Sequence, residues 1–239
     1  MREEKDCHLT RSCHFCPIEK ESIFSNLSSE DAQALECQKN VSAYHKGQNL
    51  FVEGSFVFGI YCLSKGNVKL TKLDHQGKEV ILKLAKAGDL LGRSSLFDDS
   101  PSSYTATAID DVTICFISKK TFIHLMEKNS SLAMSYLKRL SKNLSELEEG
   151  LYHSYSHNVL ERLAALILEL KEGRGEEVSP GRFRLNIRLS REEMASMIGT
   201  SSETLIRFMS MLREEEILSQ EGKVMFIEKL DKLEEIFHH

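Results

Sequence analysis

The stretch LSREEMASMIGTSSETLIRFMSML, residues 189–212, predicts two short helices joined by a tight turn. Ser190 and Glu193 have the S-x-x-E spacing of a capping box, which starts the first helix. Gly199 can supply the left-handed residue that ends this helix, and Thr200 and Ser201 can cap the second one. This layout is typical of proteins that place one helix in the major groove of DNA.

One face of the second predicted helix carries polar and charged residues that are not expected to be buried. Leu205, Met209 and Leu212 share one side, and a polar stripe occupies the other. Glutamate accepts a hydrogen bond from cytosine, and arginine forks onto guanine. Alternatively, Glu203 completes a capping box from Thr200 and pairs with Arg207 on an ordinary solvated helix. The candidate DNA-contacting residues are Ser202, Glu203, Ile206 and Arg207.

The sequence after this helix, EEEILSQEGKVMFI at 214–227, predicts a helix end, a strand, a turn around Gly222 and a second strand. A helix pair followed by a small hairpin is a winged helix-turn-helix. From Arg182 to Arg213, six arginines outnumber three glutamates, so the region carries local positive charge although the whole chain has a formal net charge of −5. The negative net charge argues against a protein that coats nucleic acid non-specifically, but it permits sequence-specific binding.

Length and composition indicate two modest globular domains: 239 residues, 41% hydrophobic and 28% charged. No apolar run is long enough for a membrane span, and the start MREEKDCHLTRSC lacks the apolar core of a secretion signal. We therefore expect a cytoplasmic protein with no membrane partner. In that compartment the six cysteines are expected as reduced thiols, metal ligands or core residues rather than as a disulfide framework.

Four segments follow along the chain, and they predict an α+β fold. Residues 1–22 are a cysteine-rich arm, and residues 23–128 are β-rich, with frequent glycines that suit an antiparallel β-roll. Residues 129–157 form a long helix, and residues 158–239 form the winged helix-turn-helix domain. Within the last segment we expect a helix at 159–170 ended by a turn at Gly173 to Gly175, a polar loop at 171–181 and a strand, FRLNIRL.

Leucines on the long helix repeat at 3, 4, 3, 4 spacing, which is typical of a coiled-coil seam. The alternative is that this helix packs on its own β-domain. Homodimerisation would give the reading helices the two-fold symmetry that paired DNA half-sites require. Because burying each leucine contributes about 1.5–3 kcal/mol, the dimer is expected to persist without a bound ligand. A regulatory signal is then expected to reorient the DNA-binding domains about a hinge near His157 to Val159. The seam consists of Leu137, Leu140, Leu144, Leu147 and Leu151.

The order of these segments resembles the CRP/FNR family of bacterial transcription regulators over residues 23–230. The resemblance is carried by KGQNLFVEGS and GDLLGRSSLF in the roll, by HNVLERLAALILEL, and by the E-T-x-x-R pattern of Glu203, Thr204 and Arg207. It implies a cyclic-nucleotide-binding-like roll, a homodimer, double-stranded DNA with a two-fold symmetric operator, and RNA polymerase as a protein partner. Ile206 departs from the small or hydroxyl residue usual there, which favours contact with a thymine methyl group.

The resemblance also bears on the signal. Arg93 stands where cyclic-nucleotide-binding members carry a glutamate, and no arginine follows before Tyr104, so no cyclic AMP is expected. The cysteines resemble those of the oxygen-sensing, FNR-like branch, in which four thiolates hold a [4Fe–4S] cluster. The five-residue gap comes first here, whereas the familiar order places the close pair first. The implied ligands are Cys7, Cys13, Cys16 and Cys115.

Other interpretations remain open at this stage. Cys115 can be a core residue, and the arm can bind zinc through its cysteines with His8 or His14, or act as a thiol switch. Haem or nitric oxide sensing is a further alternative. A different class is a metal- or ligand-binding module that acts through protein contacts. An enzyme is not expected, because no nucleophile elbow, P-loop, dinucleotide-binding glycine motif or HExxH motif is present.

Overall fold

The computed structural model describes residues 22–25, 27–97, 99–186, 189–222 and 224–238. The chain divides into two compact units, one of Met1–Lys78 and Leu82–Leu144 and the other of Glu79–Ile81 and Ser145–His239. Within the described ranges, no helix is both long enough and apolar enough to cross a membrane. The cysteines at positions 7, 13 and 16 lie outside the described residues.

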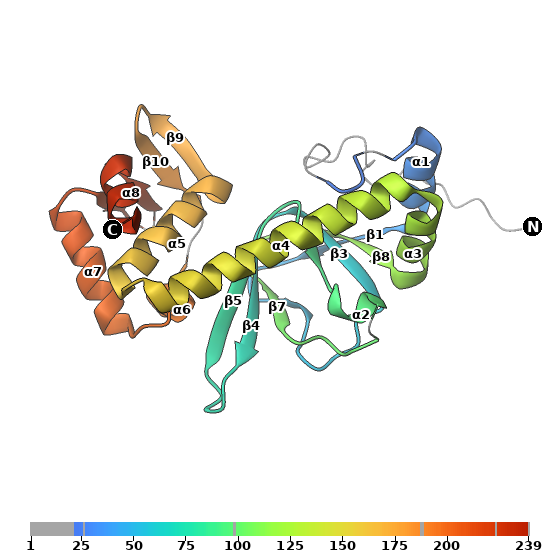
Figure 1. Ribbon diagram of the computed structural model, residues 1–239, viewed down its shortest axis with the longest axis horizontal. Coiled ribbons are helices and arrows are strands. Elements are labelled where there is room, and N and C mark those ends of the chain that lie inside the picture. The colour runs from blue at the N-terminus through green and yellow to red at the C-terminus, as the bar shows by residue number, and fades with distance from the viewer. Residues whose placement is uncertain (1–21, 26, 98, 187–188, 223, 239) are drawn as a thin grey trace, which may run out of the picture. The chain divides into compact units, whose positions relative to one another are not determined.

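Two four-stranded sheets, in the orders β1-β8-β3-β6 and β2-β7-β4-β5, belong to the first unit apart from Glu79–Ile81 at the start of β5 (Figure 1). The registered pairs are antiparallel, as in β3 with β8 and β4 with β7, which confirms the predicted antiparallel roll. The strands are β1 Asn40–Tyr44, β2 Asn49–Phe51, β3 Gly59–Lys65, β4 Val68–Leu73, β5 Glu79–Ala85, β6 Leu90–Leu91, β7 Thr105–Ala108 and β8 Val112–Ser118.

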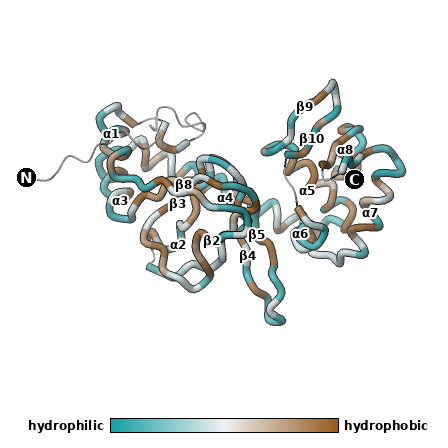
Figure 2. The backbone as a smooth tube through the Cα atoms, turned by 180° about the vertical axis from the view of Figure 1, so that it is seen from behind, coloured by the Kyte–Doolittle hydropathy of each residue, from teal (hydrophilic) through white to brown (hydrophobic). Residues whose placement is uncertain are grey.

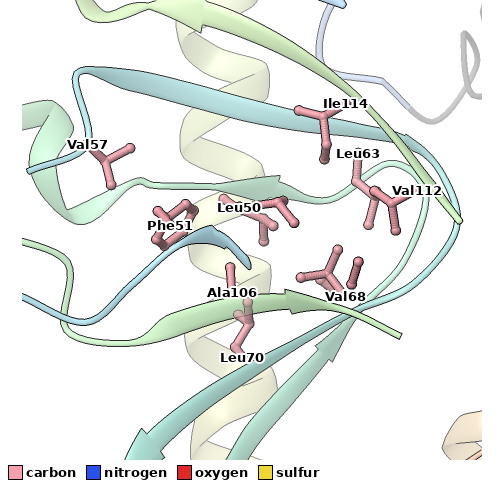
Figure 3. Packing of buried hydrophobic residues seen from close by; sticks show 12 residues of the cluster. Leu50, Phe51, Val57, Leu63, Val68, Leu70, Ala106, Val112 and Ile114 are labelled. Atoms are coloured by element: carbon pink, nitrogen blue, oxygen red, sulfur yellow. The ribbon is translucent and has the colours of Figure 1, made fainter. Parts of the chain in front are cut away.

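An apolar core fills the space between these two sheets. Leu63 and Ile114 come from one sheet, and Val68 and Ala106 come from the other. All four side chains are fully buried. Figure 3 shows these side chains converging between the strands. Successive residues of a strand point to opposite faces, so the alternate residues of β3 and β8 are left to build a second core behind the first sheet.

Helices cover that second face. They are α1 Ser29–Gln38, α3 Lys119–Lys128 and the first turns of α4, Ser130–Ser156. Ser28 and Ser118 each cap their helix by accepting a backbone N–H three residues on. The sequence analysis expected a β-rich segment over residues 23–128, so the helices α1 and α3 differ from that expectation. Their buried side chains, Leu35 of α1 and Phe122 and Leu125 of α3, complete a core for which the strands alone supply one wall.

Tight turns join the strands. At the β3–β4 turn, Gly66 has φ +88°, and a Cβ there would lie 2.6 Å from the carbonyl oxygen of Asp111, so only glycine fits. In the β4–β5 hairpin, the carboxylate of Asp74 accepts backbone N–H groups from Gln76 and Lys78. Figure 2 shows the tip of this hairpin as hydrophilic, consistent with an exposed turn.

The second unit contains helices around a third antiparallel sheet, in the order β11-β12-β10-β9. Its elements are α5 Val159–Arg174, β9 Gly175–Ser179, β10 Arg182–Leu185, α6 Arg191–Met197, α7 Ser202–Glu214, β11 Leu218–Glu221, β12 Val224–Ile227 and α8 Leu230–His238.

Part of the boundary prediction for this unit is wrong. The helix does not end in a turn at Gly173 to Gly175 but continues to Arg174, with Gly175 as its C-cap. Residues 175–179, expected in a loop, form β9 and pair with β10. Gly181 has φ +78°, which permits the tight reversal between the two strands.

Candidate nucleic-acid interface

The helix-turn-helix begins as the sequence predicts. Ser190 accepts the N–H of Glu193, whose carboxylate accepts the N–H of Ser190, and this capping box starts α6. After Ile198 the chain turns at Gly199, which has φ +63°. Ser201 then caps α7 by accepting the N–H of Thr204. These local contacts fix where the second helix starts and in which direction it leaves the turn.

Helix α7 buries one face and exposes the other. Leu205 and Leu212 are fully buried, which orients the helix on the core of its unit. Glu203, Ile206 and Arg207 are exposed, and Ile206 keeps 37% of its surface. Ser202 is half-buried. The four predicted DNA-contacting residues therefore lie away from the core, three of them open to solvent.

The carboxylate of Glu203 stays at the start of α7. Hydrogen bonds from its own backbone N–H and from Ser201 lower its pKa below the ordinary value, so the carboxylate is ionised and can accept a hydrogen bond. The alternative capping box from Thr200 is wrong, because the N-cap is Ser201. Among the described residues no ion pair joins Glu203 to Arg207, whose guanidinium lies 5.0 Å from the ring centre of Phe208.

The predicted positive charge is distributed differently from the expectation. Arg182 pairs with Glu221 at 2.7 Å and with Glu228 at 3.0 Å, and its guanidinium lies 4.2 Å from the ring centre of Phe226. These hydrogen bonds raise its pKa further. Arg182 therefore stabilises the wing sheet and is not directed at a phosphate.

Other arginines of the region are also committed within the protein. Arg184 pairs with Glu176 at 2.7 Å, and Arg213 donates to the carbonyl oxygen of Met209 at 3.1 Å. Arg188 lies outside the described residues. Of the arginines described on α6 and α7, Arg191 and Arg207 are the exposed ones, so the local charge is smaller than the sequence count suggests.

Arg162 of α5 is a positioning residue that the sequence analysis missed. Its Nε donates to the carbonyl oxygen of Ile198 at 2.9 Å, and its Nη1 donates to that of His157 at 2.7 Å. These bonds join α5 to the end of α6 and to the residue after α4. The available signal was that Arg162 is the one basic residue in the largely apolar stretch VLERLAALILEL at 159–170.

The end of α4 is packed by aromatic rings. The rings of His153 and His157 lie 4.4 Å apart, and Phe237 of α8 contacts both, with ring centres at 5.2 and 5.4 Å. Burial lowers the pKa of His153, and the neighbouring His157 adds to this effect. Together with Arg162, this packing surrounds the connection between α4 and α5, where the sequence analysis expected a hinge.

The leucine seam is exposed for most of its length. Leu137, Leu144, Leu147 and Leu151 keep 57–59% of their surface, and Leu140 packs partly against the core of the roll. The alternative, packing on the chain's own β-domain, is met by other residues of α4: Leu132 and Tyr136 are buried there. Helix α4 therefore packs on its own roll with one face and leaves four seam leucines exposed to solvent.

Of the four proposed cluster ligands, the described residues include Cys115 alone. It lies on β8, is half-buried and packs against the core behind the first sheet, which also contains Ile23 and Phe24. Cys37 of α1 is disulfide-bonded, whereas the sequence analysis expected reduced thiols, metal ligands or core residues rather than a disulfide framework. Among the described residues no group of three or more histidine, cysteine, aspartate or glutamate side chains is arranged for a metal ion.

In the turn that corresponds to the nucleotide-binding segment of the family, a side chain accepts a backbone hydrogen bond. The N–H of Gly92 donates to the hydroxyl of Tyr104 at 3.3 Å, and burial raises the pKa of this hydroxyl. Tyr104 packs on Phe51, with ring centres 5.6 Å apart. Asp99 pairs with Lys119 at 2.6 Å.

These features define a class of protein: a transcription regulator that combines a β-roll with a DNA-binding winged helix-turn-helix. Residues 41–129 match the cyclic nucleotide-binding domain and residues 161–236 match the Crp-like helix-turn-helix domain. The chain belongs to the CRP/FNR family of transcription regulators.

Relatives of known function span nearly the whole chain. The fumarate and nitrate reduction regulatory protein of Vibrio cholerae is 28% identical over 90% of this chain and 86% of its own length. Its counterpart in Escherichia coli K12 is 26% identical over 95% and 90%. The structure of FixK2 from Bradyrhizobium japonicum superposes with a TM-score of 0.72 at 20% identity, covering 83% of this chain and 96% of that one, and supports the fold.

Replacing Arg162 by methionine tests its positioning role. Two carbonyl groups lose a charged donor, so we expect the free energy of unfolding to fall by about 1.5–3 kcal/mol, measured by urea denaturation of the full chain. Arg191→Met, at an exposed position of α6, is the matched control and should change stability little. Equal effects of the two substitutions would contradict the role.

Proposed function

We propose that this regulator is a homodimer that reads a two-fold symmetric operator through the exposed face of α7. The observation that carries the proposal is the division of α7 into a buried face, with Leu205 and Leu212, and an exposed face, with Glu203 and Arg207. An ionised glutamate accepts from the amino group of cytosine, and an arginine donates two hydrogen bonds to guanine. The half-site therefore contains a G·C pair read by these two residues.

The neighbouring positions tune the half-site. Ile206 is apolar and 37% exposed, so it favours contact with the methyl group of thymine. Ser202 lies one turn earlier, where its hydroxyl can donate or accept a hydrogen bond. RNA polymerase is the protein partner that this function requires, in the cytoplasm where the DNA is.

The dimer forms through the exposed leucines of α4. Four leucines at 57–59% exposure on one helix are an apolar stripe of the kind that marks an interaction surface. A second copy of the same helix is complementary to this 3, 4, 3, 4 spacing. Since the seam has no acidic interruption, the dimer persists without a ligand, and the signal acts by reorienting the DNA-binding domains about the connection at His157 to Val159.

The N-terminal arm and Cys115 are proposed to sense oxygen or redox state by holding a [4Fe–4S] cluster. Cys115 supplies a half-buried thiol, and Ile23 and Phe24, which follow the arm, pack in the same apolar cluster as Cys115. The two residues that follow the arm in the sequence therefore lie in the same apolar cluster as the proposed fourth ligand. When bound, the cluster would supply a centre whose stability depends on oxygen. The ligands would be Cys7, Cys13, Cys16 and Cys115.

A second candidate for the signal is thiol oxidation without metal. The observation that favours it is that Cys37 is disulfide-bonded. The zinc alternative would use Cys7, Cys13 and Cys16 with His8 or His14, which lie outside the described residues. Cyclic AMP is not the proposed signal, because Tyr104 occupies the backbone N–H of Gly92 and Arg93 stands in the glutamate position.

Base reading is tested with Arg207→Ala. We expect a loss of about 1–3 kcal/mol at one base position and relaxed preference there, measured by selection from random duplexes followed by titration. Arg191→Ala is the charge-matched control: it should weaken all sequences alike and lower the salt slope by about 1. If Arg207→Ala left the selected sequence unchanged, α7 would not read bases and the regulator would act through protein contacts.

The seam is tested with Leu147→Lys. Two lysines would meet across the dimer while two buried leucines are lost, each worth about 1.5–3 kcal/mol, so sedimentation should show a shift from dimer to monomer. Leu73→Lys, at a roll position with 64% exposure, is the matched control and should stay dimeric. A wild-type monomer at micromolar concentration, or a Leu147→Lys dimer, would rule the seam out.

The cluster is tested by purification without oxygen. We expect a broad absorption near about 400 nm that bleaches in air, with about four irons per chain. Cys115→Ser should lose iron, whereas Cys62→Ser, one strand away, should keep it. Zinc or no metal in the wild-type protein would reject the cluster and leave the thiol candidate.

A further inference from the structure

Two thiols face each other in the middle of the first sheet. Cys62 of β3 is directly opposite Cys115 of β8 in the antiparallel register. Residues opposite each other in a sheet point to the same face, and both belong to the apolar cluster that contains Ile60 and Ile117. Neither cysteine is disulfide-bonded. The regulator function described above uses Cys115 and gives no role to Cys62.

The ladder places the two residues at a distance suited to a disulfide. The N–H of Lys119 donates to the carbonyl oxygen of Phe58 at 2.9 Å, four residues before Cys62 and four after Cys115. Hydrogen-bonded and non-bonded pairs alternate along an antiparallel ladder, so Cys62 and Cys115 form a hydrogen-bonded pair with a Cα separation of about 5.5 Å. Disulfides span about 4.4–6.8 Å between Cα atoms, so the bond needs no change in register, but they need Cβ atoms about 3.5–4.5 Å apart. The Cβ atoms of a hydrogen-bonded pair lie toward the far end of about 4.5–5.5 Å, so closing the bond draws β3 and β8 together and leaves a strained disulfide that is readily reduced.

We propose that Cys62 and Cys115 are a thiol–disulfide pair that closes reversibly across β3 and β8. The pair depends on the sheet register alone and stands whether or not Cys115 also holds a metal cluster. Where the cluster proposal holds, Cys62 competes for Cys115, because a disulfide removes the thiolate that the cluster needs.

Burial sets the order of the reaction. Cys115 is half-buried and Cys62 is 8% exposed, so Cys115 is the thiol that meets an oxidant first. With glutathione disulfide as oxidant, the Cys115 thiolate displaces one glutathione thiolate and forms a mixed disulfide. The Cys62 thiolate then attacks the Cys115 sulfur and releases the second glutathione. Both protein thiols lose their protons, and two electrons pass to the glutathione.

The experiment uses the full, folded chain. Reduced protein is equilibrated with glutathione disulfide, alkylated and digested with trypsin, which can cleave after Lys65 and Arg93, between the two cysteines. Mass spectrometry should find the peptide with Cys62 linked to the peptide with Cys115, and dithiothreitol should separate them. A triple variant with serine at positions 7, 13 and 16 should give the same link, since the arm takes no part.

The matched variant is Cys62→Ala, which removes the resolving thiol and keeps a small side chain in the core. The mixed disulfide on Cys115 should then accumulate about tenfold over wild type. Glutathione that stays on Cys115 in the presence of Cys62, or a link from Cys115 to another cysteine only, would overturn the pair. Loss of DNA binding or of iron would not affect this readout, so its failure is distinct from failure of the proposed function.

Discussion

The constraint on which the roll depends is the two-sided burial of β3 and β8. Leu63 and Ile114 point into the core between the sheets, whereas Ile60, Cys62 and Ile117 point to the other face. A strand buried on both faces needs a cover on each side. The second sheet covers one face, and α1, α3 and the start of α4 cover the other. Packing against this apolar face stabilises the three helices.

The same principle of divided faces governs the functional helices. On α4, Leu132 and Tyr136 pack on the roll and leave the seam leucines exposed. On α7, Leu205 and Leu212 are anchored in the core and leave Glu203 and Arg207 exposed. In both helices the buried face holds the element in one orientation and leaves the exposed face open for the partners that we propose, a second chain for α4 and DNA for α7.

Electrostatics in the DNA-binding unit are more local than composition suggests. Arg182 and Arg184 are paired with glutamates of the wing sheet, and Arg162 donates to backbone carbonyls at the ends of two helices. These guanidinium groups position elements of the unit. The guanidinium of Arg207 lies 5.0 Å from the ring centre of Phe208 on the same helix, and the residue is exposed. The DNA recognition that we propose therefore depends on a few exposed side chains, held by elements that are paired with one another.

The sequence by itself determined the features that depend on neighbours along the chain. The Ser190 capping box, the left-handed Gly199, the wing turn at Gly222 and the periodic stripes of α4 and α7 follow from spacing and side-chain chemistry, and the structure confirms them. The tertiary structure alone decided the strand β9, the pairing of Arg182, the anchoring by Arg162 and the facing of Cys62 and Cys115. Arg182 with Glu228, Arg162 with Ile198, and Cys62 with Cys115 join residues distant in sequence, whereas β9 forms by pairing with the neighbouring strand β10. Sheet register and helix packing set these partners, and local patterns do not encode them.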